Sequence, residues 1–554
     1  MADDFGAVTP LSESVLWRLN RAWFEREGPA AWSTGTVPSM ITTNAVMGLS
    51  YARVVVEFLR RWAETSTAEE RRQPVHIVEL GAGSGRFAYN FVRKLEPRLR
   101  AVPALRDLRV TYVMTDFARS TIDGWRRHER LAPLVVEGRL DFAAFDGAWP
   151  APLRLVQSGT DLDPAAPAPG PLIVLANYVI DGLPLDSFVH EGGVFGEHVV
   201  RVVTPYGMKD ISSLDDIRLS WGRRAVAAGR YEDPELERLL RSLAGGRGDR
   251  TILLPVAFLR TLRYLRSLAT GPLLFLTADK GWSRTPIGPQ GEGPGMATHG
   301  SVSFMVDYSV IATYVRQQGG VAFVPPHQPA SLATAAFVLG GQTAAWSELG
   351  QLFTDVVVDG GPDDWFQLKE MLDGEQGVPT LAQLMARLRA AQWDSWVFLD
   401  LFRAFMIRTI FVTEDERLDV RLALRNVEEL YFPIGEHADV PFCVAAVLWR
   451  IGDPAAALRL LAWSERLHGP DGERSTLAAL CHRERGDLAA ARHATTLAIK
   501  YEPDLELPYQ LVNQLELDAT GAGVRADGDD AWSAALWVST RAPGRPCFQR
   551  MPDA

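Results

Sequence analysis

The sequence predicts an α/β protein, with a doubly wound parallel sheet covered by helices on both faces and a mostly helical C-terminal region. Short apolar runs alternate with amphipathic stretches over residues 75 to about 325, as expected of repeated strand–helix–strand units. From about residue 345 onward the pattern is mostly helical. A chain of 554 residues is also too long for one ordinary core, so two or three domains are expected.

The elements can be placed in order along the chain. Residues 1–70 form an N-terminal helical segment, in which "SYARVVVEFLRRWAE" is apolar on one face. The first strand is "VHIVEL", followed by the helix "RFAYNFVRKLEP". Later strands are expected at "RVTYVMTD", "GRLDFAAFD", "GPLIVLANYVIDGLP" and "GPLLFLTADKG". The stretch "SRTPIGPQGEGPGMATHG" is rich in glycine and proline, which predicts an irregular surface loop that could act as a lid.

The helical part contains an internal repeat. The dipeptide Gly-Asp at 452–453 recurs at 486–487, 34 residues later, each time between two helical stretches. This pattern resembles the tetratricopeptide repeat, whose helix pairs stack at that period, and a degenerate third copy is expected upstream. The repeats could form a cap that stabilises the first domain or a groove for a partner peptide. The expected C-terminal parts, after an α/β domain at 71–345, are a helical connector (346–430), the repeats (431–520) and a tail (521–554).

Composition excludes several classes of function. The net charge is −11, so general electrostatic binding to nucleic acid or to an anionic membrane is not expected. The N-terminus lacks the features of a signal peptide, and no apolar run is long enough to cross a bilayer. The three cysteines form no metal-binding pattern, and they suggest buried thiols in a reducing cytoplasm. We therefore expect a cytoplasmic protein without a metal site, whose oligomeric state the sequence leaves open.

The turn after the first strand points to a nucleotide-like ligand. Gly81, Gly83 and Gly85 are spaced G-x-G-x-G, whereas dinucleotide-binding turns have G-x-G-x-x-G. Glu79 stands two residues before Gly81, and E-x-G-x-G-x-G at the end of a first strand resembles motif I of class I methyltransferases. A carboxylate suits the amino group and sulfonium of S-adenosylmethionine, and bare glycine backbone lets its methionine part lie close. The alternative is an ordinary glycine-rich turn without a ligand.

Two further acids follow later strands. Asp116 ends the second strand, where a carboxylate can accept hydrogen bonds from both ribose hydroxyls. Asp146 ends the third strand and could accept one from the adenine amino group, with Asp141 as the rival residue. The alternative for each is a solvated acid at the end of a strand.

The fourth strand carries a more specific resemblance. The stretch "VLANYVIDGLPLDSFVHEGGVFGEHVV" resembles the "A-N-E-x-x-D-A-L-P" segment of the MidA family and its trailing hairpin, and "FLTADKGW" resembles that family's "D-Y-G" strand. The likeness covers roughly residues 30 to 330. MidA-like proteins are S-adenosylmethionine-dependent methyltransferases, and their mitochondrial members methylate arginine on a respiratory complex I subunit. The resemblance therefore implies the same cofactor and class of reaction.

One departure bears on the acceptor. Where the family has Asn-Glu, this chain has Asn177-Tyr178, and a tyrosine cannot pair with a guanidinium as an anion near pH 7. Asn177 and Tyr178 partly match the Asn-aromatic arrangement of amino-methyltransferases, in which the amide oxygen orients the acceptor nitrogen. Asn177 could equally be a buried residue that satisfies backbone groups. Asp181 matches the family's "D-A-L-P" aspartate, and Asp181, Asp279 and His299 are the candidate bases.

The sequence thus predicts a class I methyltransferase domain of MidA type with C-terminal tetratricopeptide-like repeats. The expected acceptor is a nitrogen or carboxylate on a peptide or protein, because a repeat array suits a peptide better than a metabolite. The expected catalytic residues are Asn177, Tyr178 and Asp181. The alternatives are a catalytically silent scaffold that retains the fold and a small-molecule methyltransferase in a biosynthetic pathway.

Overall fold

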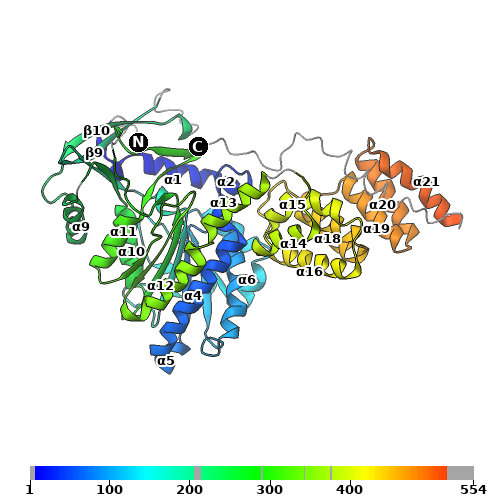
Figure 1. Cartoon of the computed structure of the whole chain (residues 1–554), viewed down its shortest axis with the longest axis horizontal. Helices are drawn as coiled ribbons and strands as arrows, with labels where there is room; N and C mark the ends of the chain where they lie inside the picture. Colours follow the sequence, from blue (N-terminus) through cyan, green and yellow to red (C-terminus); the bar gives the residue numbers. More distant parts are fainter. Residues whose placement is uncertain are drawn as a thin grey trace. The chain divides into compact units, whose positions relative to one another are not determined.

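Figure 1 shows the computed structural model of the chain, which forms two compact units, one up to Leu372 and one from Asp373 onward. The structure describes residues 7–204, 214–246, 248–288, 291–341, 343–374 and 377–520. The expected C-terminal tail, 521–554, lies outside the described residues. Among the described residues, no helix combines the length and the apolar character that a membrane span requires.

A seven-stranded sheet forms the centre of the first unit, in the order β17-β18-β12-β7-β2-β3-β4. The strand bounds are Val321–Phe323, Ala333–Leu339, Leu273–Asp279, Leu172–Asn177, Val75–Leu80, Val110–Asp116 and Leu140–Ala144, in that order. The five strands from β12 to β4 are parallel, while β18 pairs antiparallel with both β12 and β17. The chain order reverses between β2 and β7, and in open α/β sheets ligands bind at such a point, beyond the carboxyl ends of the strands.

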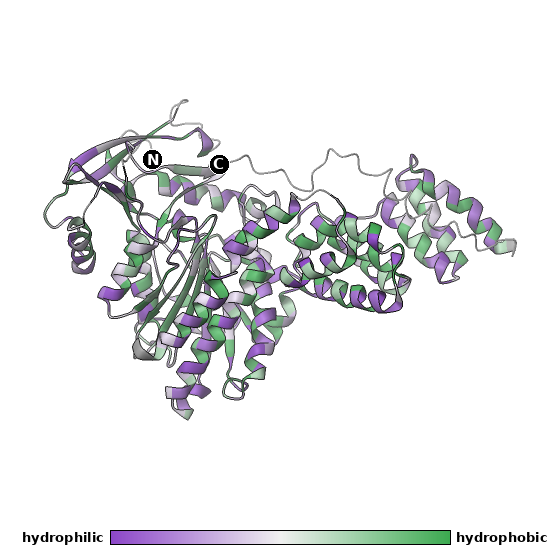
Figure 2. Cartoon of the chain, in the orientation of Figure 1, coloured by the Kyte–Doolittle hydropathy of each residue, from purple (hydrophilic) through white to green (hydrophobic). Residues whose placement is uncertain are grey.

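Helices cover both faces of this sheet because alternate strand residues point to opposite sides. On one side, α4 (Ala45–Thr65) and α6 (Arg86–Ala101) pack against each other, and Phe91 of α6 lies 5.4 Å from the Tyr112 ring of β3. On the other side, α10 (Val256–Ser267) and α11 (Tyr308–Gln317) share one apolar core with the strands. In Figure 2 the strands of this sheet are mostly apolar, as expected of a sheet that is buried on both faces.

A second sheet combines four strands that lie between β7 and β12 in the chain with β1, which lies near the N-terminus. Its order is β1-β9-β8-β11, with β10 paired to β9, and its pairs are antiparallel. The strands are Thr9–Pro10, Val194–Val203, Asp186–Glu191, Arg250–Leu254 and Arg218–Ala225, in that order. The hairpin of β8 and β9 is the one expected after the fourth strand, and both residues of its turn, Gly192 and Gly193, have positive φ.

Two segments differ from the sequence expectation. The glycine- and proline-rich stretch is not irregular throughout, because β14 (Met296–His299) forms a hairpin with β15 (Ser301–Phe304). Residues 346–372, where a helical connector was expected to begin, lie within the first unit. There α12 (Ser347–Phe353) packs against α4, and Trp346 stacks on Phe58 of that helix. The apolar face of α4, in the N-terminal segment, is thus part of the core of the first unit.

The second unit is a series of helices from α14 to α21, with bounds Leu381–Ala390, Ser395–Arg408, Glu414–Leu430, Val440–Arg450, Pro454–His468, Gly472–Glu484, Leu488–Tyr501 and Glu506–Thr520. The repeated Gly-Asp dipeptides join α17 to α18 and α19 to α20. Gly452 and Gly486 have φ of 79° and 77°, a backbone region that favours glycine, and Asp453 and Asp487 cap the following helices. The repeat in the sequence is therefore a repeat of helix–turn–helix structure.

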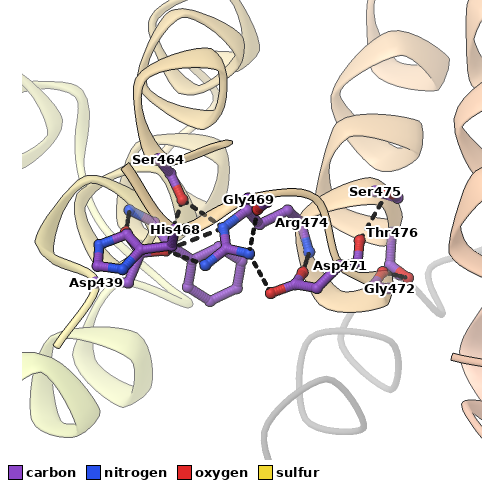
Figure 3. Close-up of polar contacts among 10 residues, drawn as sticks. Asp439, Ser464, His468, Gly469, Asp471, Gly472, Arg474, Ser475 and Thr476 are labelled. Atoms are coloured by element: carbon purple, nitrogen blue, oxygen red, sulfur yellow. Dashed lines mark hydrogen bonds and ion pairs between the residues drawn. The ribbon is translucent and has the colours of Figure 1, made fainter. Parts of the chain in front are cut away.

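A buried polar network holds consecutive helix pairs together (Figure 3). The Arg474 guanidinium donates to the Asp439 carboxylate at 3.0 and 2.8 Å, to Ser464 Oγ at 2.6 Å and to the Gly469 carbonyl at 2.8 Å. It also pairs with Asp471, the N-cap of α19. Because Asp439 caps α17 and Ser464 lies on α18, this one side chain connects α19 to the preceding helix pair.

Candidate cofactor and acceptor site

The glycine turn lies where β2 meets α6. Gly81, Gly83 and Gly85 have φ of 59°, 53° and 82°, a region that other residues adopt only with strain. A Cβ atom at Gly81 would lie 3.0 Å from the Val179 side chain, and one at Gly83 would lie 2.9 Å from the Trp32 ring. The turn therefore needs glycine for its backbone conformation, and because the side chains of Val179 and Trp32 lie close to it.

Glu79 lies beneath this turn and is 5% exposed. Its carboxylate accepts a hydrogen bond from the Tyr112 hydroxyl at 2.9 Å, and burial raises its pKa to about 8. Glu79 is not among the residues that line the cleft described below. Any contact with a ligand would therefore require a water molecule or a movement of the side chain.

Asp116 ends β3 next to the same turn, and it does line the cleft. Its carboxylate accepts from the amide of Ala118 at 2.9 Å and also from the amides of Gly83 and Phe117. Burial nevertheless raises its pKa to about 6. The carboxylate is thus held in a fixed orientation between the glycine turn and the cleft, which suits a pair of ribose hydroxyls.

The two candidate acids of the third strand have different surroundings. Asp141 lies within β4, and its carboxylate accepts from the backbone amides of Phe142, Gln157 and Ser158 at 2.7–2.9 Å. Asp146 follows the strand and lines the cleft. The structure therefore makes Asp141 a residue that holds a loop, and it leaves Asp146 as the acid that faces the cleft.

Asp146 already has a partner from the N-terminal helix α1 (Leu16–Glu27). It forms an ion pair with Arg21, whose guanidinium carbon lies 4.8 Å from the Phe117 ring centroid. The neighbouring Asn20 donates to the Val302 carbonyl of β15 at 3.3 Å and accepts from its amide at 3.0 Å. These contacts hold α1 over the cleft. The sequence analysis did not find Arg21 or Asn20, because no motif marks contacts between residues so far apart in the chain.

Asn177 and Tyr178, expected to act together, point in different directions. The Asn177 amide oxygen accepts a hydrogen bond from the Tyr51 hydroxyl of α4 at 3.0 Å, and Asn177 is not among the cleft-lining residues. Tyr178 does line the cleft. Its φ is 53°, which is strained for a tyrosine, and such strain is concentrated at functional sites.

Asp181 lies one turn further on, in the short helix Ile180–Gly182, beside the end of β12. Its amide donates to the Asp279 carboxyl at 3.4 Å, and the two carboxyl groups lie within hydrogen-bonding reach of each other. Burial is the main cause that raises the pKa of both groups, to about 6 for Asp181 and well above the usual range for Asp279. Asp181 faces the cleft, while Asp279 is fully buried behind it.

The cleft joins these groups at the carboxyl ends of β2, β3, β7 and β12. Its empty volume is about 1290 Å³, which includes the solvent at its open mouth. Aromatic residues dominate the walls, and the polar groups include Lys280 and His299. The aromatic lining residues are Trp17, Phe24, Trp32, Phe117, Phe145, Trp149 and Tyr178.

Residues 52–276, about two fifths of the chain, match a family model described as "Putative S-adenosyl-L-methionine-dependent methyltransferase". Two crystal structures from Burkholderia thailandensis, of proteins of one superfamily, are similar at 13% identity over 62% of this chain and 91% of theirs, with TM-scores of 0.37 and 0.34. The first of them is bound to S-adenosyl-homocysteine. No curated protein matches the sequence. For residues 52–276, the family match confirms the predicted class of enzyme and its cofactor, a methyltransferase that uses S-adenosyl-L-methionine.

Proposed function

We propose that this protein transfers a methyl group from S-adenosylmethionine to a nitrogen or carboxylate of a peptide or protein, in the cleft at the strand ends. The observation that carries the proposal is that one cleft joins a glycine turn and Asp116 on one side with Asp181 on the other. The strand order supports a class I methyltransferase fold, because it reverses between β2 and β7, next to these residues.

The residues present fit the cofactor. Gly81 presents bare backbone to the cleft, and Asp116 offers a fixed, buried carboxylate there. The glycine turn and Asp116 would hold the methionine and ribose parts, with Asp146 near the adenine. When bound, S-adenosylmethionine supplies a methyl group that is already activated on a positive sulfur. The chain then has mainly to orient the acceptor, to exclude water and to remove a proton where the acceptor carries one.

The aromatic walls and the roof of α1 and β15 surround the acceptor side. A narrow group such as one side chain can enter without the rest of a protein. We propose that the helical second unit supplies the binding surface for such a peptide partner. Three side chains of α21 support this, since Tyr509, Val512 and Leu517 are 39–48% exposed. A truncation after residue 372 should then keep cofactor affinity and lose partner capture.

A second candidate is a scaffold that binds the cofactor without turnover. The observation in its favour is that Asn177 does not line the cleft, and its amide oxygen accepts from Tyr51 instead of facing an acceptor. The two functions differ in a mass-spectrometric search for methyl groups on proteins that co-purify with the chain. A methylated partner supports the enzyme, and a partner that binds but stays unmethylated in the presence of S-adenosylmethionine supports the scaffold.

The cofactor step has its own test. Calorimetry should show binding of S-adenosyl-homocysteine, and Gly83→Val should abolish it, because a β-branched side chain at φ 53° would meet the Trp32 ring and close the turn. The matched control is Gly138→Val. Gly138 also has positive φ, at 68°, but nothing lies within 4 Å of its added Cβ, and it lies outside the glycine turn. Equal loss of binding in both variants would mean that backbone strain alone explains the effect.

A further inference from the structure

The acceptor side of the cleft contains two carboxyl groups that are hydrogen-bonded to each other. Asp181 and Asp279 come from the ends of neighbouring parallel strands, β7 and β12, which brings residues 98 positions apart into contact. The Asp181 amide donates to the Asp279 carboxyl at 3.4 Å, and Asp279 is fully buried whereas Asp181 borders the cleft. Two like charges so close together in a buried site cannot both be ionised, so the pair shares one proton.

Depth of burial decides which member keeps the proton, because Asp279 is fully buried and Asp181 borders the cleft. Behind Asp279, the hydroxyls of Thr277 and Tyr308 lie 3.1 and 3.4 Å from its Oδ2 atom. Tyr51 of α4 and Tyr178 also face the pair, and all three tyrosines are neutral because burial raises their pKa. The charged group that faces Asp181 is Lys280, which favours its ionised form, and His299 lies near Lys280 on the cleft wall. The single negative charge therefore resides on Asp181, at the cleft surface.

We propose that Asp181 accepts the proton during methyl transfer and that the methyl group goes to an amine nitrogen. In this proposal Asp279 positions Asp181 and holds the proton that the two carboxyl groups share. This inference rests on the proposed function and deepens it, because it selects nitrogen over carboxylate. An amine reaches the cleft as an ammonium ion, and the Asp181 carboxylate attracts it. A carboxylate acceptor would instead face a negative charge on the same wall.

The step balances in atoms and charge. Asp181 takes one proton from the ammonium ion and becomes a neutral carboxylic acid. The freed nitrogen lone pair forms a bond to the methyl carbon, while the electron pair of the carbon–sulfur bond returns to sulfur. The products are a methylated ammonium ion and S-adenosyl-homocysteine, and Asp181 afterwards gives its proton to water in the cleft.

The basicity of Asp181 also favours an amine over a guanidinium. The pKa of Asp181 is about 6, whereas that of a free lysine amine is about 10.4 and that of an arginine guanidinium is above 12. Proton transfer to Asp181 therefore costs less free energy from an amine than from a guanidinium. Tyr178 lies on the same wall and supplies no anion to pair with a guanidinium fork.

Binding of small probes tests the proposal without a known substrate. The protein is loaded with S-adenosyl-homocysteine, and the affinities of n-butylamine and butyrate are measured by saturation-transfer NMR at pH 7.5. We expect the amine to bind about tenfold more tightly than the carboxylate, the effect of one favourable charge contact. The preference should fall to about one in Asp181→Asn, and also when the pH is lowered through about 6, where Asp181 becomes protonated.

Two further variants separate the pair from a general effect of burial. Asp279→Asn keeps a hydrogen-bond donor to Asp181, so the pH at which the preference is lost should stay near 6. Asp279→Leu removes that donor, and the loss should move to higher pH. The matched control is Asp307→Asn, because Asp307 is also a buried acid with a raised pKa, but it caps α11 and does not line the cleft.

The outcomes are distinct. If butyrate binds as tightly as butylamine, or if the preference survives Asp181→Asn or pH 5, the proposal is wrong. If Asp307→Asn also abolishes the preference while its circular dichroism is unchanged, the charge at Asp181 is not its origin and the proposal is again wrong. Failure of the wild-type protein to bind S-adenosyl-homocysteine would instead overturn the proposed function, before any probe is added.

Discussion

In the second unit, the buried carboxylate of Asp439 lies against the guanidinium of Arg474 and the hydroxyl of Ser464 (Figure 3). In the first unit, the buried carboxyl of Asp279 lies against a second carboxyl, that of Asp181. The Asp439 group is surrounded by donors that match its charge, and it connects helices. The Asp279 group lacks such a match and must hold a proton instead. The compensated Asp439 thus helps to hold the repeats together, whereas the uncompensated Asp279 lies at a strand end beside the cleft.

The same contrast appears within the cleft. Glu79 and Asp116 are buried at the cofactor side, and neither forms an ion pair among the described residues. Asp146, on the same side, is compensated by Arg21. An adenine amino group would have to share that carboxylate with the guanidinium or displace it. Of these acids, Asp116 lines the cleft without an ionic partner among the described residues, so a hydroxyl-rich ligand can approach it directly.

The largest expected effect is on the compensated network. Arg474→Met removes the cation from a carboxylate that stays buried, and breaking such a pair typically costs about 3–5 kcal/mol. The free energy of unfolding of the second unit, measured by urea titration, should fall by that amount. Affinity for S-adenosyl-homocysteine should not change. The double variant Arg474→Met/Asp439→Leu should recover part of the loss, and no recovery would show that Arg474 acts by packing alone.

At the cofactor side, we expect Asp116→Ala to weaken binding of S-adenosyl-homocysteine by about tenfold to a hundredfold. Each charge-assisted hydrogen bond is worth about 1.5–3 kcal/mol, and the carboxylate is held in place by three backbone amides. The control is Glu137→Ala, an exposed acid that pairs with Arg139. An unchanged dissociation constant for Asp116→Ala, measured by calorimetry, would move the ribose contact to another residue.

The smallest effect concerns stability against pH. The pKa of Glu79 is about 8 in the folded protein, compared with 4.5 as its reference value, so the folded state holds a proton that the unfolded chain has released. A raised carboxyl pKa means that stability falls as pH rises from about 4.5 to about 8. Between pH 7 and 8, above the reference pKa of histidine, each such proton contributes at most about 1.4 kcal/mol per pH unit.

Glu79→Gln should remove the contribution of this one proton to the pH dependence of stability. The first unit of the variant should lose about 1 kcal/mol less than the wild type between pH 7 and 8 in denaturant titrations. The remaining slope should come from Asp279, whose pKa is also raised well above its usual range. Parallel curves for the two proteins would mean that Glu79 is ionised in the folded state and that burial does not keep it neutral.

The features that the sequence predicted well are those that neighbouring residues determine. The strand β2, the glycine turn and the acid at the end of β3 depend on short-range patterns, because left-handed turns require glycine and parallel strands end at one edge. The hairpin of β8 and β9 and the repeated turns at Gly452 and Gly486 belong to the same class. The family match over residues 52–276 agrees with these patterns.

The arrangement of the acceptor side could not be predicted from short-range patterns, because contacts between residues far apart in the chain determine it. Asn177 and Tyr178 are adjacent, yet one bonds to Tyr51 of α4 and the other lines the cleft, since alternate residues at a strand end face opposite sides of the sheet. Asp181 and Asp279 were separate candidates, and only the pairing of β7 with β12 brings them together. Arg21 lies 125 residues before its partner Asp146, and nothing in its local sequence indicates the contact.

The central claim is that the cleft binds S-adenosylmethionine at the glycine turn and Asp116. The most direct measurement is a calorimetric titration of the full chain with S-adenosyl-homocysteine and, separately, with NAD. We expect saturable binding of S-adenosyl-homocysteine that is weakened at least about tenfold by Asp116→Ala, and no binding of NAD. Binding of NAD without binding of S-adenosyl-homocysteine, or binding that is indifferent to Asp116, would contradict it.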